Sequence, residues 1–510
     1  MQPPVLDAKT RQVLGAPLMA VDQDLFFSRR LGLGLKPDET LGATPREWAM
    51  DQLRSVPPVD FFDKDGNRIV ARLDPLAAQS AKLAADYVEA CHQWEIYKNA
   101  HNKLDDASKT MSNQEYQDRN WKEIVYPYKR IPVWRDALAK TLTAVNGKSP
   151  VFERFWMFWC NHFVVALQNA EIELYWGVHE RNIRKHMVGT FADMVRDAIL
   201  DPAMLIYLNN DTSVGPHSLQ ARDPRSDNHD LNENLGRELL ELHTVSPAAG
   251  YAQKDVTEAA LILTGWQQYA GAISQGKLPA SVPYGTFFHA PSHEPGPRTV
   301  MGKTYKPIGK GDNQALELIN GLAGYPQTAH HLATKLARAF VADEPPPESV
   351  DRIAKVFLDT TGDMVAVHSA VVEEVLTYAT QYSKMTTPEN WLVQSYRVTG
   401  AEVPLFPPSG GLESIQWVYK EMGQALEQCP QPNGYSELMA DWLSRAMVDR
   451  RVRQAYRMGQ AAGALSVDTL GDYAARLAGA DAPLVTMIRH AESRPIAVAL
   501  LLTSPQFLKI

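Results

Sequence analysis

The stretch from Asn232 to Trp266 carries the residues whose types and spacing are most suited to chemistry. It reads as two helices joined by a loop that contains Pro247 and Gly250, residues that end a helix. Glu238 falls at the edge of the leucine stripe of the first helix. A buried carboxylate must be paired, neutral or metal-bound, because an isolated buried charge is very costly. The position therefore predicts Glu238 as a metal ligand or a general base, with a structural ion pair as the alternative.

A regular helix, turning about 100° per residue, restricts the partners of Glu238. Arg237 and Glu241 are spaced i,i+4, which predicts a helical ion pair. His243 lies about 140° from Glu238 by the same step, so a regular helix would not bring both to one metal. Asn232 is the expected N-cap, since its side chain can accept an unpaired N–H of the first turn. Glu238 must then find its partners elsewhere in the chain.

The segment from Pro150 to Leu167, PVFERFWMFWCNHFVVAL, is apolar on all sides and predicts a buried helix. Asn161 and His162 are the polar residues near its end, and buried polar groups need partners. His162 is a candidate ligand or general base held in an aromatic wall. The alternative is a core histidine that is hydrogen-bonded to the backbone or to a carboxylate.

A third group of candidates lies in FFHAPSHEPGPRTVMG, residues 287–302. His293 is followed by a glutamate, but no second histidine stands where the HExxH zinc motif requires it. Pro291 and Pro295 argue against a helix here. His293 is therefore interpreted as part of a site loop or, equally, of a structural loop.

The segment from Thr328 to Val341 places Lys335 and Arg338 on a shared helix face. These basic residues could hold an anionic substrate, but a solvated helix face is the favoured interpretation. The chain contains no phosphate-binding loop and no GxSxG nucleophile elbow.

Two hypotheses for function follow. In the first, the chain is a hydrolytic enzyme, metal-assisted or of general acid/base type. Its catalytic residues would be Glu238, His162, Arg237 and His293, with Arg237 orienting an anion through its planar guanidinium. A divalent metal would be held by Glu238, His162, Glu241 and His293. In the second, the chain is a non-catalytic binding or assembly protein whose buried polar network fixes its helices.

Composition excludes few classes. The 510 residues include 51 Lys and Arg against 59 Asp and Glu, a net charge of −8 that argues against a dedicated nucleic-acid binder. Cys91, Cys160 and Cys429 form no disulfide framework. No run approaches the ~20 apolar residues that cross a bilayer. Arg29 and Arg30 resemble a twin-arginine export signal only weakly, because the apolar run that follows is too short. With no signal peptide at its start, the chain is expected in the cytoplasm as given, or in the periplasm or outside the cell if a signal has been removed.

The pattern predicts a mainly α fold, a large array of helices with a long irregular loop and a small β-hairpin near residues 267–313. The expected divisions are an N-terminal helical region, 1–150, with a polar insertion at 103–122; a core helical domain, 151–400; and a C-terminal helical region, 401–510, packed on the core in one globule. Single helices are expected over Leu76–Asn99 and Val178–Leu200.

Several segments together resemble a bacterial family, the domain-of-unknown-function family numbered eighteen hundred. They are RRLGLG (29–34), FWCNHF (158–163), DPAMLIYLNNDTSVGP (201–216), the 232–266 stretch, HEPGPRTVMGK (293–303) and TAHHLATKLARAFVADEPPP (328–347). The resemblance covers roughly residues 20–450 and implies a mainly helical protein. The family usually has alanine where Gly236 stands.

The resemblance supplies no reaction. It implies that many relatives are exported. Their genes often neighbour a second family that resembles alkaline phosphatases and sulfatases. That association gives a phosphatase- or sulfatase-like protein as the expected partner, and envelope or polysaccharide metabolism as the expected setting.

Overall fold

A computed structural model describes residues 22–60, 62, 87–108, 111–120, 122–123, 131–167, 170–226, 230–268, 286–379, 383–404, 414–463 and 465–510. Over this part of the chain the fold is mainly α, as predicted, with 62% helix, about 20 helices and two small two-stranded antiparallel sheets. None of its helices is both long and apolar enough to span a bilayer.

The first half of the chain forms the helices that surround the candidate site. They are α2 (Gln23–Leu31), α3 (Pro45–Gln52), α5 (Tyr87–Ser108), α6 (Asn113–Arg119), α7 (Ile131–Asn146), α8 (Pro150–His162), α9 (Ala170–Lys185), α10 (Phe191–Ile199), α11 (Pro202–Tyr207), α12 (Asn234–Glu238) and α13 (Gln253–Leu263).

The second half continues the helical array. Its helices are α15 (Asn313–Ala323), α16 (Pro326–Phe340), α17 (Pro347–Asp359), α18 (Met364–Tyr378), α19 (Pro388–Thr399), α20 (Ile415–Glu421), α21 (Met439–Trp442), α22 (Arg445–Ala461), α23 (Val467–Ala478), α24 (Pro483–Arg489), α25 (Arg494–Leu502) and α26 (Pro505–Leu508).

The two hairpins lie in the irregular segment where β structure was predicted. Strand β1 (Trp266–Gln268) pairs with β2 (Thr286–Phe288), and β3 (Arg298–Val300) pairs with β4 (Lys303–Tyr305). The predicted small β structure near residues 267–313 is thus confirmed, as two hairpins where one was expected. Residues 269–285 of the predicted loop lie outside the described residues.

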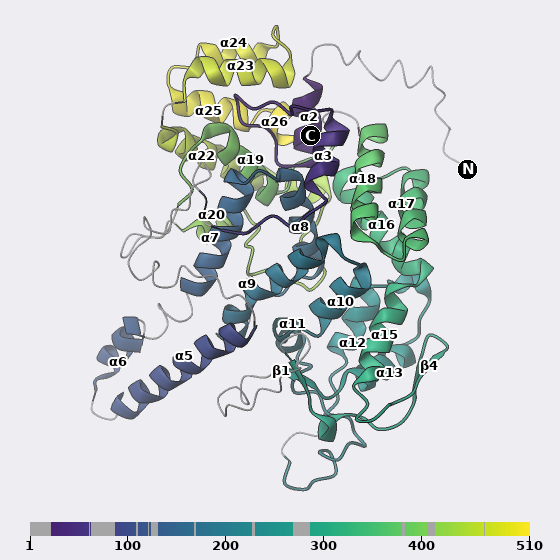
Figure 1. The fold of residues 1–510 in the computed structure, drawn as a ribbon. Coiled ribbons are helices and arrows are strands. Elements are labelled where there is room, and N and C mark those ends of the chain that lie inside the picture. The colour runs from purple at the N-terminus through teal and green to yellow at the C-terminus, as the bar shows by residue number, and fades with distance from the viewer. Residues whose placement is uncertain are drawn as a thin grey trace.

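Two predicted helices differ in extent. The helix expected over Val178–Leu200 is broken, because α9 ends at Lys185 and α10 begins at Phe191, after a short 3₁₀ turn and Gly189. The helix expected over Leu76–Asn99 is observed from Tyr87, and its earlier residues lie outside the described part. In Figure 1, α5 and α6 project from the body on one side, near the end that carries the hairpins.

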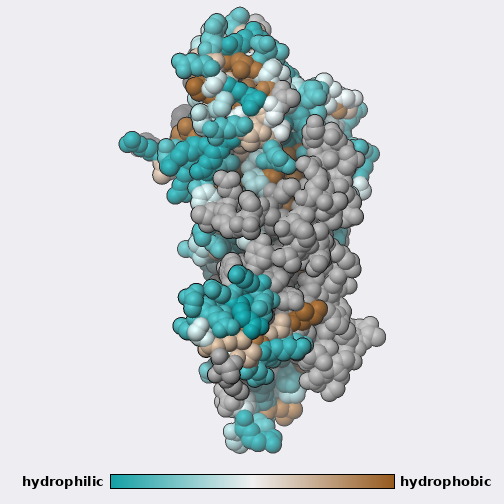
Figure 2. All heavy atoms as spheres, turned by 90° about the vertical axis from the view of Figure 1, so that its left-hand side faces the viewer, coloured by the Kyte–Doolittle hydropathy of each residue, from teal (hydrophilic) through white to brown (hydrophobic). Residues whose placement is uncertain are grey.

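The core buries α8 from every direction. Each residue of α8 except Asn161 is buried, and α2, α3, α7 and α9 all pack against this helix. The apolar sequence of α8 requires this central place, since no face of it suits water. On the face shown in Figure 2, by contrast, hydrophilic side chains predominate among the described residues and hydrophobic ones form scattered patches.

The paired arginines of α2 have structural partners. Arg30 is fully buried and donates to the backbone oxygens of Phe340, Val341 and Ile510. Arg29 donates to Gln394 and to backbone oxygens near the C-terminal end of α26. The RRLGLG segment therefore joins the N-terminal helix to the end of α16 and to the last residues of the chain (Figure 1).

Candidate functional site

The last turn of α8 brings His162 into contact with helix α16. Lys335 on α16 donates from Nζ to Nδ1 of His162 over 2.8 Å. His162 is 1% exposed, whereas Lys335 is half-buried. The predicted buried environment of His162 is thus observed. Its direct hydrogen-bond partner is a lysine, whereas the expected partner was the backbone or a carboxylate.

Two further histidines complete a histidine–lysine cluster of His162, His243, His331 and Lys335. The ring centroid of His162 lies 5.7 Å from that of His243 and 6.5 Å from that of His331. His331, half-buried on α16, donates from Nε2 to the backbone oxygen of Leu242. The cluster therefore joins α8, α16 and the segment that follows α12.

A π-helical turn explains why His243 reaches this cluster. Residues Leu239–His243 continue α12 as a π-helix, which is wound more widely than an α-helix. Thr244 donates its hydroxyl to the Leu239 oxygen, and Ser246 donates its N–H to the Leu240 oxygen. These bonds occupy carbonyls at the end of the turn. Side-chain directions calculated for a regular α-helix therefore do not apply beyond Glu238, where the π turn begins.

The π turn also changes the pairing predicted for Arg237. The predicted ion pair with Glu241 is wrong, and Arg237 instead pairs with Glu233 at 3.2 Å and bonds to Gln253. Glu233 lies one regular α-helical turn before Arg237, so their side chains meet. Glu241 lies in the π turn, whose wider winding moves its side chain away from Arg237. Asn232 accepts the N–H of Asn234, but the N-cap of α12 is Glu233, so the predicted N-cap is wrong by one residue.

The cluster keeps its imidazoles neutral. Burial, and then the charge of Lys335, lower the pKa of His162 well below its ordinary value and that of His243 to about 3. Each of these two rings lies near the other residue's backbone, but neither contact has hydrogen-bond geometry. Nε2 of His162 and both ring nitrogens of His243 thus have no hydrogen-bond partner among the described residues.

The pKa of Lys335 is lowered as well, which favours its neutral amine form. Burial lowers its pKa to about 8, and the carboxylate of Glu437 opposes that shift. Glu437, just before α21, also faces Arg154 and Lys384, and burial raises its pKa. An amine with such a pKa is partly unprotonated near neutral pH, which a surface lysine is not.

A second buried ion pair supports the turn after His162. His179 on α9 contacts Oδ2 of Asp201 through Nδ1 at 2.7 Å and the backbone oxygen of Phe163 through Nε2 at 2.7 Å. Burial opposes the charged imidazole, but Asp201 prevails and raises the pKa of His179. Asp201 also caps α11. The contacts of Asp201 with His179, and of His179 with Phe163, hold the backbone of the residue that follows His162.

Glu238 lies half-buried at the end of α12, beside the π turn. Burial, and then the charge of Glu241, raise its pKa, while Arg237 opposes the shift. No hydrogen bond or ion pair of the Glu238 carboxylate occurs within the described part of the chain. Glu238 is thus a perturbed carboxyl on the same short segment as His243.

The structure places His293 in a separate environment. Its Nδ1 contacts the backbone oxygen of Thr264, and its Nε2 contacts Oε1 of Gln314, both at 2.9 Å. Its neighbour Glu294 pairs with Arg298 and His217. His293 shares none of these contacts with His162, and both of its ring nitrogens are occupied. This arrangement fits the structural-loop interpretation.

No group of three or more His, Cys, Asp or Glu side chains in the described ranges is arranged to hold a metal ion. The donors nearest to such a set are the rings of His162, His243 and His331. The ammonium form of Lys335 stands among them and would repel a cation.

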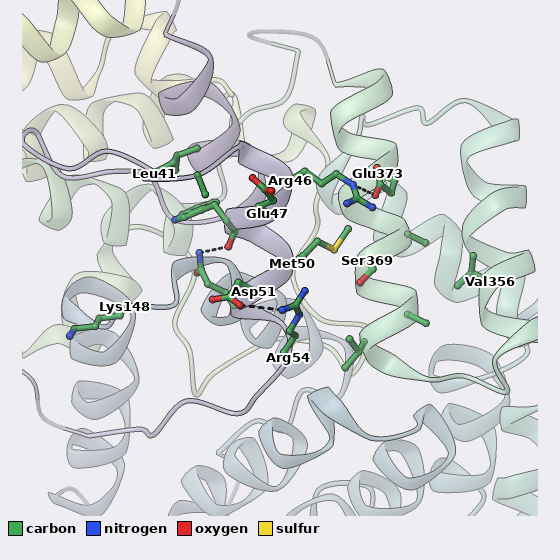
Figure 3. A pocket seen from close by; sticks show the side chains of 16 residues that line it. Leu41, Arg46, Glu47, Met50, Asp51, Arg54, Lys148, Val356, Ser369 and Glu373 are labelled. Carbon is green, nitrogen blue, oxygen red and sulfur yellow. Dashed lines mark hydrogen bonds and ion pairs between the residues drawn. The ribbon is translucent and has the colours of Figure 1, made fainter.

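One cleft lies away from the histidine–lysine cluster. It has a volume of about 890 Å³ and is lined by residues of α3, α17 and α18 together with Lys148. Figure 3 shows Arg46 reaching from α3 to Glu373 on α18, an ion pair of 2.5 Å, and Arg54 pairing with Asp51. Its rim carries both signs of charge, so charge alone selects no ligand.

Sequence reasoning named Lys335 but assigned it to a solvated face, and it placed His243 opposite the site. The spacing of α16 does carry a signal for Lys335, because Leu332, Leu336 and Ala339 around it are buried. For His243 the local pattern carried no such signal, since the π turn depends on the bonds of Thr244 and Ser246.

Comparison with known proteins identifies the family. The model of the family described as "Protein of unknown function (DUF1800)" matches residues 27–509. No curated protein matches the chain, and no solved structure does. The match covers nearly all of the 510 residues, including every segment on which the resemblance was based. The chain therefore belongs to the DUF1800 family.

Proposed function

We propose that the chain is a hydrolytic enzyme of general acid/base type in which Lys335 transfers the proton. The observation that carries this proposal is the 2.8 Å contact between Lys335 Nζ and His162 Nδ1, made by a half-buried lysine. A lysine with a lowered pKa can act as a base and then as an acid near neutral pH.

The roles follow from the contacts. The neutral amine of Lys335 takes a proton from a water molecule as that water attacks the electrophilic centre of the substrate. The resulting ammonium returns the proton to the leaving oxygen. His162 accepts an N–H of Lys335 through Nδ1 and so positions the amine. Glu437 limits how far burial lowers the pKa of Lys335.

The general acid/base form is preferred to the metal-assisted form because of the donor set. The lysine stands among the histidines that would otherwise be ligands, and a cation there opposes a divalent ion. Glu238 is retained as a second candidate acid/base group, since its pKa is raised and it shares a segment with His243. Arg237 and His293, which have partners of their own, are not part of the proposed reaction.

The test uses Lys335→Met with Lys254→Met as the matched control, since Lys254 is exposed on α13. Both proteins and the wild type are assayed on chromogenic esters, phosphate esters, sulfate esters and glycosides. We expect turnover by Lys335→Met to be at least about 100-fold slower than turnover by the wild type, which is the range of effects assigned to acid/base groups. Equal turnover by Lys335→Met would refute the proposal.

A second measurement needs no substrate. The rate at which Lys335 is acetylated is followed against pH by peptide mass spectrometry. A midpoint near pH 8 is expected from its pKa of about 8. A midpoint close to about 10.4, the ordinary lysine value, would remove the basis of the proposal.

A binding or assembly role is a second candidate function, favoured by the cleft beside α3. Its partner would be the phosphatase- or sulfatase-like protein expected from gene neighbourhood. Ala370 lines this cleft, so Ala370→Phe should fill its floor, whereas Ala446→Phe alters an exposed site on α22. Purified proteins would be titrated against that partner. Weaker binding by Ala370→Phe alone supports this role, and unchanged binding excludes the cleft.

A further inference from the structure

Two small cavities lie beside the last turns of α8. Each has a volume of about 20 Å³. The first is lined by Lys140, Cys160 and Glu180, and the second by Arg154, Asn390 and Glu437. Both are also lined by Met157, Asn161, Glu389 and Gln424. Each cavity has room for one water molecule and offers it several polar partners.

One buried cation faces two buried carboxylates at the first cavity. Lys140 Nζ lies 2.9 Å from Glu180 Oε1 and 3.6 Å from Glu389 Oε1. The exposed fractions of these three side chains are 4%, 9% and 8%. A single ammonium can neutralise one carboxylate, and a second buried charge without a partner is very costly.

The other charged groups nearby have partners of their own. Arg154, which lines the second cavity, donates to the backbone oxygens of Arg29 and Arg30 and faces Glu437. Arg184 forms a bidentate pair with Glu153, and His179 is paired with Asp201. Glu437, on the side of the second cavity, carries the same sign as Glu389. The thiol of Cys160 is held in its neutral form, because burial raises its pKa.

Among the described residues, Glu389 also lacks a hydrogen bond at Oε1, the oxygen that lies 3.6 Å from Lys140 Nζ. Oδ1 of Asn390 beside it has no hydrogen-bond partner among these residues either. The Gln424 side chain is oriented toward Glu389, and its Oε1 accepts the N–H of Glu389. A protonated carboxyl differs from a carboxylate in that it can donate a hydrogen bond as well as accept one.

We infer that Glu389 holds a proton at pH 7 and, with one water in each cavity, forms a proton path from the Lys140–Glu180 pair to Glu437 beside Lys335. Burial raises the pKa of Glu389, which agrees with the charge count. In each transfer Glu389 gives its proton to the water of the second cavity, and that water protonates Glu437. The water of the first cavity then gives a proton to Glu389 and takes one from the Lys140 ammonium, and solvent later reprotonates the Lys140 amine.

The position of Glu437 links this path to the proposed site. Asn161 and Ala339 line the second cavity with Glu437. Asn161 precedes His162 in the chain, and Ala339 lies one turn beyond Lys335 on α16. Only this end of the path rests on the proposed function. The protonation of Glu389 stands independently of any activity.

The first test is infrared spectroscopy of the whole protein at pH 7 in H₂O and D₂O. Subtracting the spectrum of Glu389→Gln from the wild type should leave a protonated-carboxyl band that shifts in D₂O. Glu348→Gln, at an exposed position of α17, is the control and should leave the protonated-carboxyl band in place. Absence of the protonated-carboxyl band from the Glu389 difference would overturn the inference.

If Glu389→Gln does not fold, the wild type labelled with ¹³C at the glutamate carboxyl carbons answers the same question by NMR. One glutamate should remain protonated at pH 7, and its absence would again overturn the inference. A high-resolution crystal structure tests the path separately. One ordered water within hydrogen-bond reach of Glu389 is expected in each cavity, and dry cavities would exclude the path whatever the activity of Lys335.

Discussion

Lys335 Nζ lies 2.8 Å from His162 Nδ1, and this contact joins two residues 173 positions apart in the chain. It places a half-buried amine among three imidazoles whose pKa values burial lowers. The positive charge of Lys335 is therefore unfavourable in the folded protein, and it lowers the free energy of unfolding. Groups held in this way are typical of functional sites, where stability is given up for reactivity.

Lys335→Met should make the protein more stable at pH 7. The folded pKa of Lys335 is about 8, below the unfolded value of about 10.4, so the unfolded state binds more protons between these values. The stability of the wild type consequently rises with pH across that window. The full difference corresponds to about 3 kcal/mol, and we expect about 1–2 kcal/mol after allowing for solvent. Urea unfolding at pH 7 measures the gain, which should shrink above about pH 10. A loss of stability at pH 7 would contradict the prediction.

His243→Phe should flatten the acid side of the stability profile. His243 has a folded pKa of about 3, against about 6.5 when unfolded, so stability is lost as pH falls through this window. Removing the imidazole should reduce the slope by up to about 1.4 kcal/mol per pH unit. Unfolding free energies at pH 7, 6 and 5 measure it. His330→Phe, at an exposed position of α16, is the control and should keep the wild-type slope.

Arg30→Lys should destabilise the protein by about 3 kcal/mol or more, since it leaves buried carbonyls without donors. The guanidinium of Arg30 serves three backbone oxygens from two parts of the chain, and an ammonium cannot reproduce that planar fork. Arg54→Lys is the matched control. Arg54 pairs with Asp51 on the surface, with side chains 71% and 80% exposed, so its change should stay within about 0.5 kcal/mol. Equal effects in thermal unfolding would show that Arg30 is not a clamp.

Gly434→Ala should cost more stability than Gly302→Ala, although both glycines have a φ of +79°. A Cβ at Gly434 would lie 2.3 Å from the backbone oxygen of Asn161, whereas nothing lies within 4 Å of one at Gly302. Gly302→Ala therefore measures the backbone strain alone, about 1–2 kcal/mol. Any further loss of stability in Gly434→Ala measures the contact of the added Cβ with Asn161, the residue before His162. The acetylation profile of Lys335 should shift only in Gly434→Ala, and identical results for the two variants would argue against this coupling.

Glu238→Gln should leave the fold intact and increase stability at neutral pH. The pKa of Glu238 is raised in the folded state, so the folded protein binds its proton more tightly than the unfolded chain does. The stability contributed by this group is present at low pH and is lost as pH rises through the folded pKa. Glutamine removes that loss and the repulsion from Glu241. Chemical unfolding at pH 4 and pH 7 should show the gain only at the higher pH. A large loss at pH 7 would indicate that Glu238 has a partner it depends on.

Local sequence predicted the elements of the fold well. A capping box of Thr44 and Glu47 begins α3, and its two hydrogen bonds lie within four residues. The apolar segment from Pro150 is a buried helix, since no side of it can face water. It ends at His162, five residues earlier than predicted, and residues 163–167 form a turn and a stretch without regular structure.

The membership of the candidate site was predicted only in part. His162 was named, and Lys335 was noted but assigned to solvent. His243 was placed opposite Glu238 because a uniform helical step was applied across a π turn. The boundaries at residues 150 and 400 remain predictions. A hydrophobic pattern gives the face of one helix, but it carries no record of which other helix that face will meet.

By itself, the sequence determined a mainly helical chain of the DUF1800 family with a buried aromatic helix ending in Asn161 and His162. Those properties follow from bonds and side-chain faces within a few turns. Tertiary structure alone decided that Lys335 would reach His162, that His293 would be bonded elsewhere, and that Lys140 would face two carboxylates. Such contacts join residues far apart in the chain. They form because helices pack to bury their apolar faces and carry their polar groups into register.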